Sequence, residues 1–259
     1  RAFRRPLSDE QKQMYVSKHF ADGIEPEIAL KRSVLLILKS PRFLYRDVIA
    51  ASDDPYDVAS RLSFGLWDSI PDAELLRAAA AGELKNRDKV VQQAERMVKD
   101  PRTKAKLKEF FLQWLKIDQL PDLAKDAKDF PEFTPELAND LRTSLELFVD
   151  ETVWSEASDY RQLLLADTIP MNGRLAKFYG LDMPGDAGFQ PKSLDPRHRA
   201  GVLTHPYLLA NFAYTSTSSP IHRGVFISRS MLGRALKSPP TAIAPSAPDL
   251  APDLTTRER

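Results

Sequence analysis

The chain of 259 residues contains four histidines and no cysteine, so chemistry that needs an imidazole must use His19, His198, His205 or His222. Histidine has an ordinary pKa close to neutral pH, and it serves both as a general acid or base and as a metal ligand. The absence of cysteine excludes disulfides, thiolate metal sites, a cysteine nucleophile and covalent attachment of haem within this chain. The search for a chemical site therefore starts from the imidazoles.

His205 lies in an apolar stretch, after Val202-Leu203-Thr204 and before Pro206. An imidazole in such surroundings needs a hydrogen-bond partner, because an unpaired buried polar group costs free energy. The sequence leaves two interpretations open: a functional histidine, or a buried histidine whose polar atoms are satisfied within the fold. We keep His205 as a candidate cofactor-binding residue.

His222 occupies the third position of a helix that Ser219-Pro220 is predicted to begin, and Arg223 follows it. A polar helix start of this kind can receive an anion or a propionate. Plain capping of the helix is the alternative. His222 and Arg223 are therefore further candidates for binding a cofactor.

The other two histidines have simpler explanations. His19 is predicted to lie at a helix end, where the helix dipole favours it. His198 lies in the charged run Asp195-Pro196-Arg197-His198-Arg199 and is expected to be a solvated loop residue. Neither is a candidate site residue.

Standard catalytic and binding motifs are absent from the sequence. There is no G-x-G-x-x-G, P-loop, G-x-S-x-G elbow, H-E-x-x-H or EF-hand loop. The carboxylates, such as Asp150-Glu151, recur at helical spacing and are expected to be solvated, so they do not indicate a two-carboxylate hydrolase. The aromatic stripe Phe110, Phe111 and Trp114 could border a cofactor, but it is more typical of a core helix. The sequence assigns no catalytic residue and leaves enzymatic activity uncertain.

The elements that must position these candidates are predominantly helical. A capping residue followed by proline and an apolar stripe predicts the start of a helix, because proline at the first helical position loses no hydrogen bond. Four such starts occur, at Asp54-Pro55, Asp100-Pro101, Thr134-Pro135 and Ser219-Pro220. Their apolar stripes contain Val58, Leu62 and Leu66; Leu107, Phe110, Phe111, Trp114 and Leu115; Leu137, Leu141, Leu145, Phe148 and Thr152; and Ile221, Val225 and Leu232.

Further helices are predicted over 8–20, 27–39, 72–81, 88–99 and 171–179. Strand signals are weak, and the best candidates lie around Phe189 and Val202-Leu203. Residues 181–196 are predicted to form a long surface loop. We therefore expect a mainly all-α fold, a multi-helix orthogonal bundle with a proline-rich C-terminal arm.

Four segments follow from this pattern. We expect an N-terminal helical pair over 1–50, a central helical domain over 51–180, a loop with a C-terminal helical segment over 181–237, and a proline-rich linker or arm over 238–259. A chain of this length buries enough surface to fold without disulfides.

Charge and hydropathy argue against nucleic acid as a partner and against a transmembrane segment. Thirty-seven Lys and Arg residues nearly balance 36 Asp and Glu residues, which argues against a nucleic-acid-binding protein. The longest apolar run, Val34 to Leu38, is far shorter than the roughly 20 residues of a transmembrane segment. The chain begins Arg1-Ala2-Phe3 without methionine or signal peptide, so we expect it to be a piece of a longer protein whose targeting information is not included.

Several segments, in order, carry a resemblance to a known family. The sequence resembles the planctomycete-type cytochrome c-associated proteins, which contain domains of unknown function 1595, 1592 and 1588. The similar segments are RAFRRPLSDE (1–10), SPRFLYRD (40–47), ASRLSFGLWDSIPDAELLRAAAAGEL (59–84), AERMVKDPR (94–102), NGRLAKFYG (172–180), RAGVLTHPYLL (199–209) and TSSPIHRGVFISRSMLGR (217–234). One departure is Thr168-Ile169-Pro170-Met171, where the family often has aromatic residues.

The resemblance implies a c-type haem domain upstream and a C-x-x-C-H segment shortly downstream, and therefore an extracytoplasmic location in the periplasm or cell envelope. It implies no cofactor within this chain and haem c in the neighbouring segments. A haem attached there takes a second axial ligand from Met or His. We therefore expect the region from Leu203 to Met231 to pack against it, with His205, His222, Arg223 and Met231 as candidate cofactor-binding residues.

Three functions remain open on this basis. The first is a helical module of an exported c-type cytochrome-like protein, which supports electron transfer by packing beside haem or by docking a redox partner. Its partners would be haem-bearing domains of the same polypeptide and a redox protein, not nucleic acid. The second is a non-catalytic binding or scaffold domain for a cell-envelope or polysaccharide target. The third is an uncharacterised enzyme.

Overall fold

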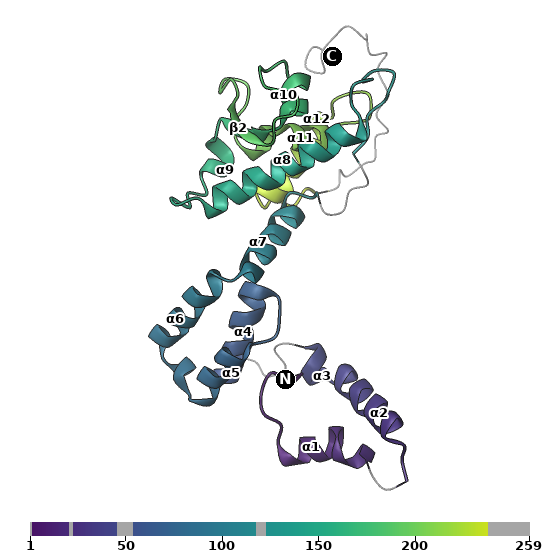
Figure 1. Ribbon diagram of the computed structural model, residues 1–259, viewed down its shortest axis with the longest axis vertical. Helices are drawn as coiled ribbons and strands as arrows, with labels where there is room; N and C mark the ends of the chain where they lie inside the picture. The colour runs from purple at the N-terminus through teal and green to yellow at the C-terminus, as the bar shows by residue number, and fades with distance from the viewer. Residues whose placement is uncertain (1, 21–22, 46–53, 118–122, 238–259) are drawn as a thin grey trace. The chain divides into compact units, whose positions relative to one another are not determined.

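The computed structural model describes residues 2–20, 23–45, 54–117 and 123–237 (Figure 1). The predicted arm over 238–259 lies outside these residues. The fold is mainly α-helical, which confirms the predicted class (Figure 1). Contacts divide the chain into two compact units, residues 1–107 and 108–259. The sequence did not predict a division at this point, and the segments expected from it stay predictions.

The first unit consists of short helices. Its elements are α1 (Asp9–Tyr15), η1 (Ser17–Phe20), α2 (Pro26–Lys39), α3 (Pro41–Leu44), α4 (Pro55–Trp67), α5 (Ala73–Ala80), η2 (Glu83–Lys85), α6 (Arg87–Val98) and the start of α7 (Pro101–Trp114). Trp67 lies at its core, where the indole Nε1 donates to the carbonyl of Met97 at 3.0 Å. The guanidinium of Arg102 stacks 3.4 Å from the centroid of the Trp67 ring, so a cation–π contact covers the outer side of the indole.

The second unit contains the candidate site residues. Its elements are α8 (Pro135–Trp154), α9 (Gln162–Leu165), β1 (Thr168–Met171), α10 (Gly173–Phe178), β2 (Gln190–Ser193), η3 (Val202–Thr204), α11 (Pro206–Asn211), α12 (Pro220–Phe226) and η4 (Ile227–Met231). The C-terminal part of α7 belongs to this unit too, and Trp114 Nε1 donates to the carbonyl of Ser230 at 2.8 Å. That bond ties α7 to η4.

Helix α8 is the central element of the second unit. The hydroxyl of Thr134 caps its N-terminus by accepting from the Leu137 N–H at 3.3 Å, and Pro135 occupies its first turn. The predicted stripe of Leu137, Leu141, Leu145, Phe148 and Thr152 is buried, as expected. Strand β1 and helices α10 and α11 contact α8 along its length. This helix therefore supplies the wall on which the candidate site is assembled.

The hairpin of β1 and β2 corrects the sequence analysis at several points. Thr168–Met171 pairs antiparallel with Gln190–Ser193, although no strand was expected at 168–171 and a long loop was expected over 181–196. The strand candidate around Phe189 is confirmed by β2, which begins at the next residue. The strand expected at Val202-Leu203 is the helical turn η3. Each strand has four residues, and β1 buries three in succession against α8, so it lacks the alternation by which a half-buried strand is recognised.

Several predicted helices end or begin elsewhere. Helix α10 begins at Gly173, because Asn172 caps it and Met171 belongs to β1. Helix α12 is shorter than expected and continues into the π-helical turn η4. Its predicted apolar stripe is wrong at Ile221 and Leu232, whose side chains are 72% and 60% exposed, and Leu232 lies beyond the end of η4. Phe110 of the α7 stripe is also exposed rather than buried in the core.

Candidate functional site

His205 forms a buried hydrogen-bonded junction between three elements. It is 1% exposed and caps α11, where its Nδ1 accepts from the Tyr207 N–H at 3.3 Å. Its Nε2 lies 3.2 Å from the hydroxyl oxygen of Ser144 on α8, and that hydroxyl donates to the carbonyl of Pro170 in β1. Because Nδ1 accepts, Nε2 carries the proton and donates to Ser144.

The surroundings of His205 keep its imidazole neutral. Burial lowers the pKa of His205 to about 3, and the positive charge of Arg199 contributes in the same direction. Both ring nitrogens have partners within the fold, so this geometry offers no free lone pair to an iron. It matches the interpretation of a satisfied buried histidine, and ligation by His205 stays an untested hypothesis.

His222 lies on the exposed side of α12. Its backbone N–H donates to the hydroxyl of Ser219 at 3.3 Å, so the predicted cap is present. Its ring centroid lies 5.0 Å from that of Tyr214. Met231, at the end of η4, is partly buried against the core of the second unit. The structure thus separates His222, which is exposed, from His205, which is sealed in the interior.

A pocket of 310 Å³ lies beside this region. Its cationic lining residues are Lys125, Arg199 and Arg223. Five aromatic rings line it as well, from Phe130, Phe133, Phe178, Tyr179 and Tyr214. Its walls come from the segment before α8, the end of α10, and the chain from Arg199 to Arg223. The tertiary structure therefore brings together residues that are up to 98 positions apart in the sequence.

Among the residues that the structure describes, no carboxylate lines this pocket, and the cations that line it are not equivalent. Lys125 donates to the carbonyls of Ala210 at 2.7 Å and Tyr214 at 2.8 Å, and burial lowers its pKa. Its ammonium therefore fixes the chain after α11. Within the described ranges, no carboxylate forms an ion pair with Arg199 or Arg223. These two guanidiniums are the groups available to an anion.

Of the candidates from sequence, only Arg223 lines the pocket. The sequence analysis missed Arg199, Lys125 and the aromatic rings, because they are dispersed along the chain. One signal was present: between Asp195 and Asp249 the sequence contains six Arg or Lys residues and no acidic residue. In a chain of net charge +1, such a run marks a locally positive surface.

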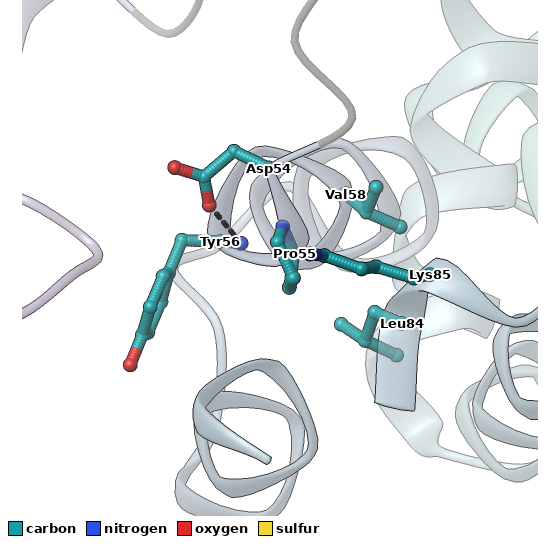
Figure 2. A pocket seen from close by; sticks show the side chains of 6 residues that line it. All are labelled: Asp54, Pro55, Tyr56, Val58, Leu84 and Lys85. Carbon is teal, nitrogen blue, oxygen red and sulfur yellow. Dashed lines mark hydrogen bonds between the residues drawn. The ribbon is translucent and has the colours of Figure 1, made fainter. Parts of the chain in front are cut away.

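A second depression, of 740 Å³, lies in the first unit at the start of α4. Asp54, Tyr56, Val58, Leu84 and Lys85 line it together with a proline. Figure 2 shows the Asp54 carboxylate turned to the backbone N–H of Tyr56, a bond of 2.8 Å. The same carboxylate also pairs with Arg5 at 3.0 Å, so the acidic group that the described lining contains already has partners within the fold.

The described residues contain neither a metal-binding cluster nor a membrane-spanning helix. Among the residues that the structure describes, no group of three or more His, Asp or Glu side chains is arranged to hold a metal ion. None of the helices in the described ranges is long and apolar enough to span a bilayer.

Comparison with known proteins matches two family models. Residues 54–181 match PSD4, a protein of unknown function (DUF1592), and residues 199–259 match PSCyt3, a protein of unknown function (DUF1588). These two regions belong to the planctomycete cytochrome c-associated families. The resemblance inferred from sequence is confirmed for both regions, and the resemblance of the N-terminal segments to DUF1595 stays a prediction. No curated protein and no solved structure matches the chain.

The two family regions build the pocket jointly. The DUF1592 region supplies Lys125 and four of the aromatic rings, and the DUF1588 region supplies Arg199, Arg223 and Tyr214. His205 likewise belongs to the DUF1588 region, whereas its partner Ser144 belongs to the DUF1592 region. The two regions therefore share one core and one candidate site.

Proposed function

We propose that this chain is a helical module that docks beside a c-type haem domain, in its own polypeptide or in a redox partner, and thereby supports electron transfer. The proposal rests on apolar side chains that are exposed along α12, η4 and the residue that follows. Ile221 of α12, Ile227 of η4 and Leu232 after η4 are 72%, 39% and 60% exposed, although the same segment buries Phe226. We call these three residues with His222 the docking face.

The chemistry of the docking face suits the exposed edge of a haem. A haem edge is apolar and carries negatively charged propionates, so it is complementary to apolar side chains among cations. Arg223, Arg229 and Arg234 lie in the same stretch of sequence as the docking face. Residues 196–248 contain no Asp or Glu, so no carboxylate within this stretch neutralises them. Opposite charges on two surfaces increase the association rate and orient the encounter.

The names of the matching families support this partner class, since they associate the domains with cytochrome c. Haem c bound by neighbouring segments would also place the module outside the cytoplasm, because attachment of this type is completed there in bacteria. Within the module, we assign the contact with haem to His222, which would bind a propionate or the iron. His205 takes a positioning role, because its ring is occupied in the interior.

The test uses the complete polypeptide with its C-x-x-C-H segments. Its optical spectrum, reduction potential and electron-transfer rate are measured at several ionic strengths. We expect Arg229→Gln with Arg234→Gln to slow electron transfer severalfold at low salt and to flatten its salt dependence. The matched control is Arg32→Gln with Arg87→Gln, which removes the same charge from exposed positions on α2 and α6.

The assignment of His222 is tested in the same protein. His222→Ala is expected to shift the reduction potential or the optical spectrum of the haem. Unchanged spectra and potentials in both His205→Ala and His222→Ala would refute any part played by these histidines beside haem. A complete polypeptide without haem-attachment cysteines would refute the proposed function as a whole.

A further inference from the structure

We infer that the pocket lined by Arg199 and Arg223 is a binding site for a carboxylate carried on a planar, apolar body. The inference goes beyond docking, because it concerns a cavity within the second unit that can be tested without any haem. Two sources could supply this chemistry, a free aromatic acid and a propionate of a neighbouring haem. Only the second source rests on the proposed function.

The lining of the pocket is positively charged, with two guanidiniums and one ammonium. Arg199 donates one hydrogen bond, from Nη1 to the carbonyl of Thr204 at 3.3 Å, and Arg223 lines the pocket without an ion pair among the described residues. A guanidinium has five N–H donors and binds a carboxylate through two of them at once. Most of this donor capacity is therefore directed at no protein acceptor.

The charge of Arg199 also acts on two neighbouring titratable groups, Tyr179 and His205. Burial raises the pKa of the Tyr179 phenol, and the charge of Arg199 partly opposes that rise. The same charge helps to lower the pKa of His205 behind the pocket wall. A positive charge beside groups that are held neutral creates a local positive potential, which an anion would relieve.

The size of the pocket and the polarity of its walls suit a planar, apolar ligand. A volume of 310 Å³ is at the small end of the range for small-molecule pockets and admits a compound of one or two rings. Besides its three cations, the pocket is lined by five aromatic rings, by Pro206, Leu209 and two alanines, and by the hydroxyl residues Thr217 and Ser218. Planar bodies stack favourably on such rings, whereas a sugar acid would need many polar partners for its hydroxyls. These walls favour an aromatic acid over a uronic acid.

Hydrogen bonds from Lys125 hold one wall of the pocket in place. Three carbonyls, one in the last turn of α11 and two just after it, accept from Lys125 Nζ, at 2.7 Å for Ala210, 3.5 Å for Ala213 and 2.8 Å for Tyr214. These bonds anchor the chain that carries Tyr214 against the segment before α8. A site with fixed walls binds without first ordering its own residues, which lowers the free-energy cost of binding.

The test measures binding of 2-naphthoate to the 259-residue chain by calorimetry and by quenching of naphthalene fluorescence. We expect saturable binding at one site and no comparable binding of 2-naphthamide, which has the same shape without the charge. Arg223→Gln and Arg199→Gln should each weaken binding at least tenfold. Arg223→Lys should recover only part of the loss, because lysine keeps the charge but cannot form the two-pronged contact.

The matched control is Arg87→Gln, which removes the same charge from an exposed position on α6 that does not line the pocket. It should bind 2-naphthoate within twofold of the wild-type chain. Circular dichroism and thermal unfolding establish that each variant is folded. Absence of 2-naphthoate binding to the folded wild-type chain would overturn the inference, and so would an equal loss in Arg223→Gln and Arg87→Gln.

The complete polypeptide distinguishes the two sources. If a haem propionate occupies the pocket, 2-naphthoate will bind the isolated chain but not the complete polypeptide, and Arg223→Gln will shift the haem potential. If the natural ligand is a free acid, the complete polypeptide will bind 2-naphthoate as tightly as the chain does. In the second case the site stands even where the haem docking proposal fails.

Discussion

His205 and Ser144 form a hydrogen bond between two residues that are 61 positions apart, with 3.2 Å between the imidazole Nε2 and the hydroxyl oxygen. The same hydroxyl donates to the carbonyl of Pro170, and the other ring nitrogen accepts from the Tyr207 N–H. The two side chains together thus join α8, β1 and α11. A histidine in this role must be neutral, because protonation of Nδ1 would break its bond to the backbone of α11.

The first prediction concerns the stability of the second unit in acid. The folded-state pKa of His205, about 3, is below its ordinary value of 6.5, so the unfolded chain takes up the proton first as the pH falls. The free energy of unfolding should therefore decrease between pH 6.5 and about 3, by roughly 1 to 4 kcal/mol from this residue. Above pH 6.5 this contribution is fully present. Urea denaturation at a series of pH values measures it.

The comparison for this prediction is His205→Gln, which keeps a neutral side chain that can donate a hydrogen bond. It should be less stable than the wild type at pH 7 and should have a shallower pH dependence between pH 4.5 and 6.5. Asp72, Asp100 and Asp195 also have lowered pKa values, but they titrate in both proteins and largely below that interval. Parallel pH profiles in the two proteins would contradict the assignment.

The second prediction concerns Gly201, at the turn before η3. Its φ is +58°, and a Cβ there would lie 2.3 Å from the backbone carbon of Leu164. Gly201→Ala should therefore lower the free energy of unfolding by more than about 2 kcal/mol, because backbone cannot move aside as a side chain can. Gly224→Ala in α12 is the control, since a Cβ there meets open space. That variant should be neutral or more stable by about 0.5 kcal/mol.

The third prediction concerns the buried face of α8. Leu141 is almost completely buried within the main core, so Leu141→Ala should cost roughly 2 to 4 kcal/mol of unfolding free energy through lost burial and the cavity left behind. Leu165 of α9 is 66% exposed, and Leu165→Ala should change the same quantity by less than about 0.5 kcal/mol. Similar losses in both variants, measured by chemical denaturation, would show that α8 does not form the core described above.

The fourth prediction concerns Lys125 as an anchor of the chain after α11. Lys125→Met keeps the length of the side chain but removes the donor for the carbonyls of Ala210 and Tyr214. We expect a loss of about 1 to 2 kcal/mol in unfolding free energy and faster amide hydrogen exchange over 210–215. Lys128→Met, at a nearby exposed position, should leave both quantities unchanged. Unaltered exchange in Lys125→Met would contradict the anchoring role.

The sequence by itself determined where most helices begin. Asp54 and Thr134 each cap a helix whose first residue is proline, and both caps are present in the structure. These signals are local, because a cap bonds to a backbone N–H only two or three residues away. The buried stripe of α8 was predictable for a similar reason, since its periodicity is contained in one helix.

Only the tertiary structure decided the hairpin, the state of His205 and the pocket. Met171 is in a strand because its partner Gln190 and the wall of α8 are present, and nothing within 168–171 signals this. Arg199 and Lys125 meet around the pocket although 74 positions separate them. Burial and pairing depend on which distant segments pack together, and that information is distributed over the whole chain. The sequence therefore identified the candidate imidazoles. Tertiary packing decided that His205 is buried and hydrogen-bonded, whereas His222 is exposed.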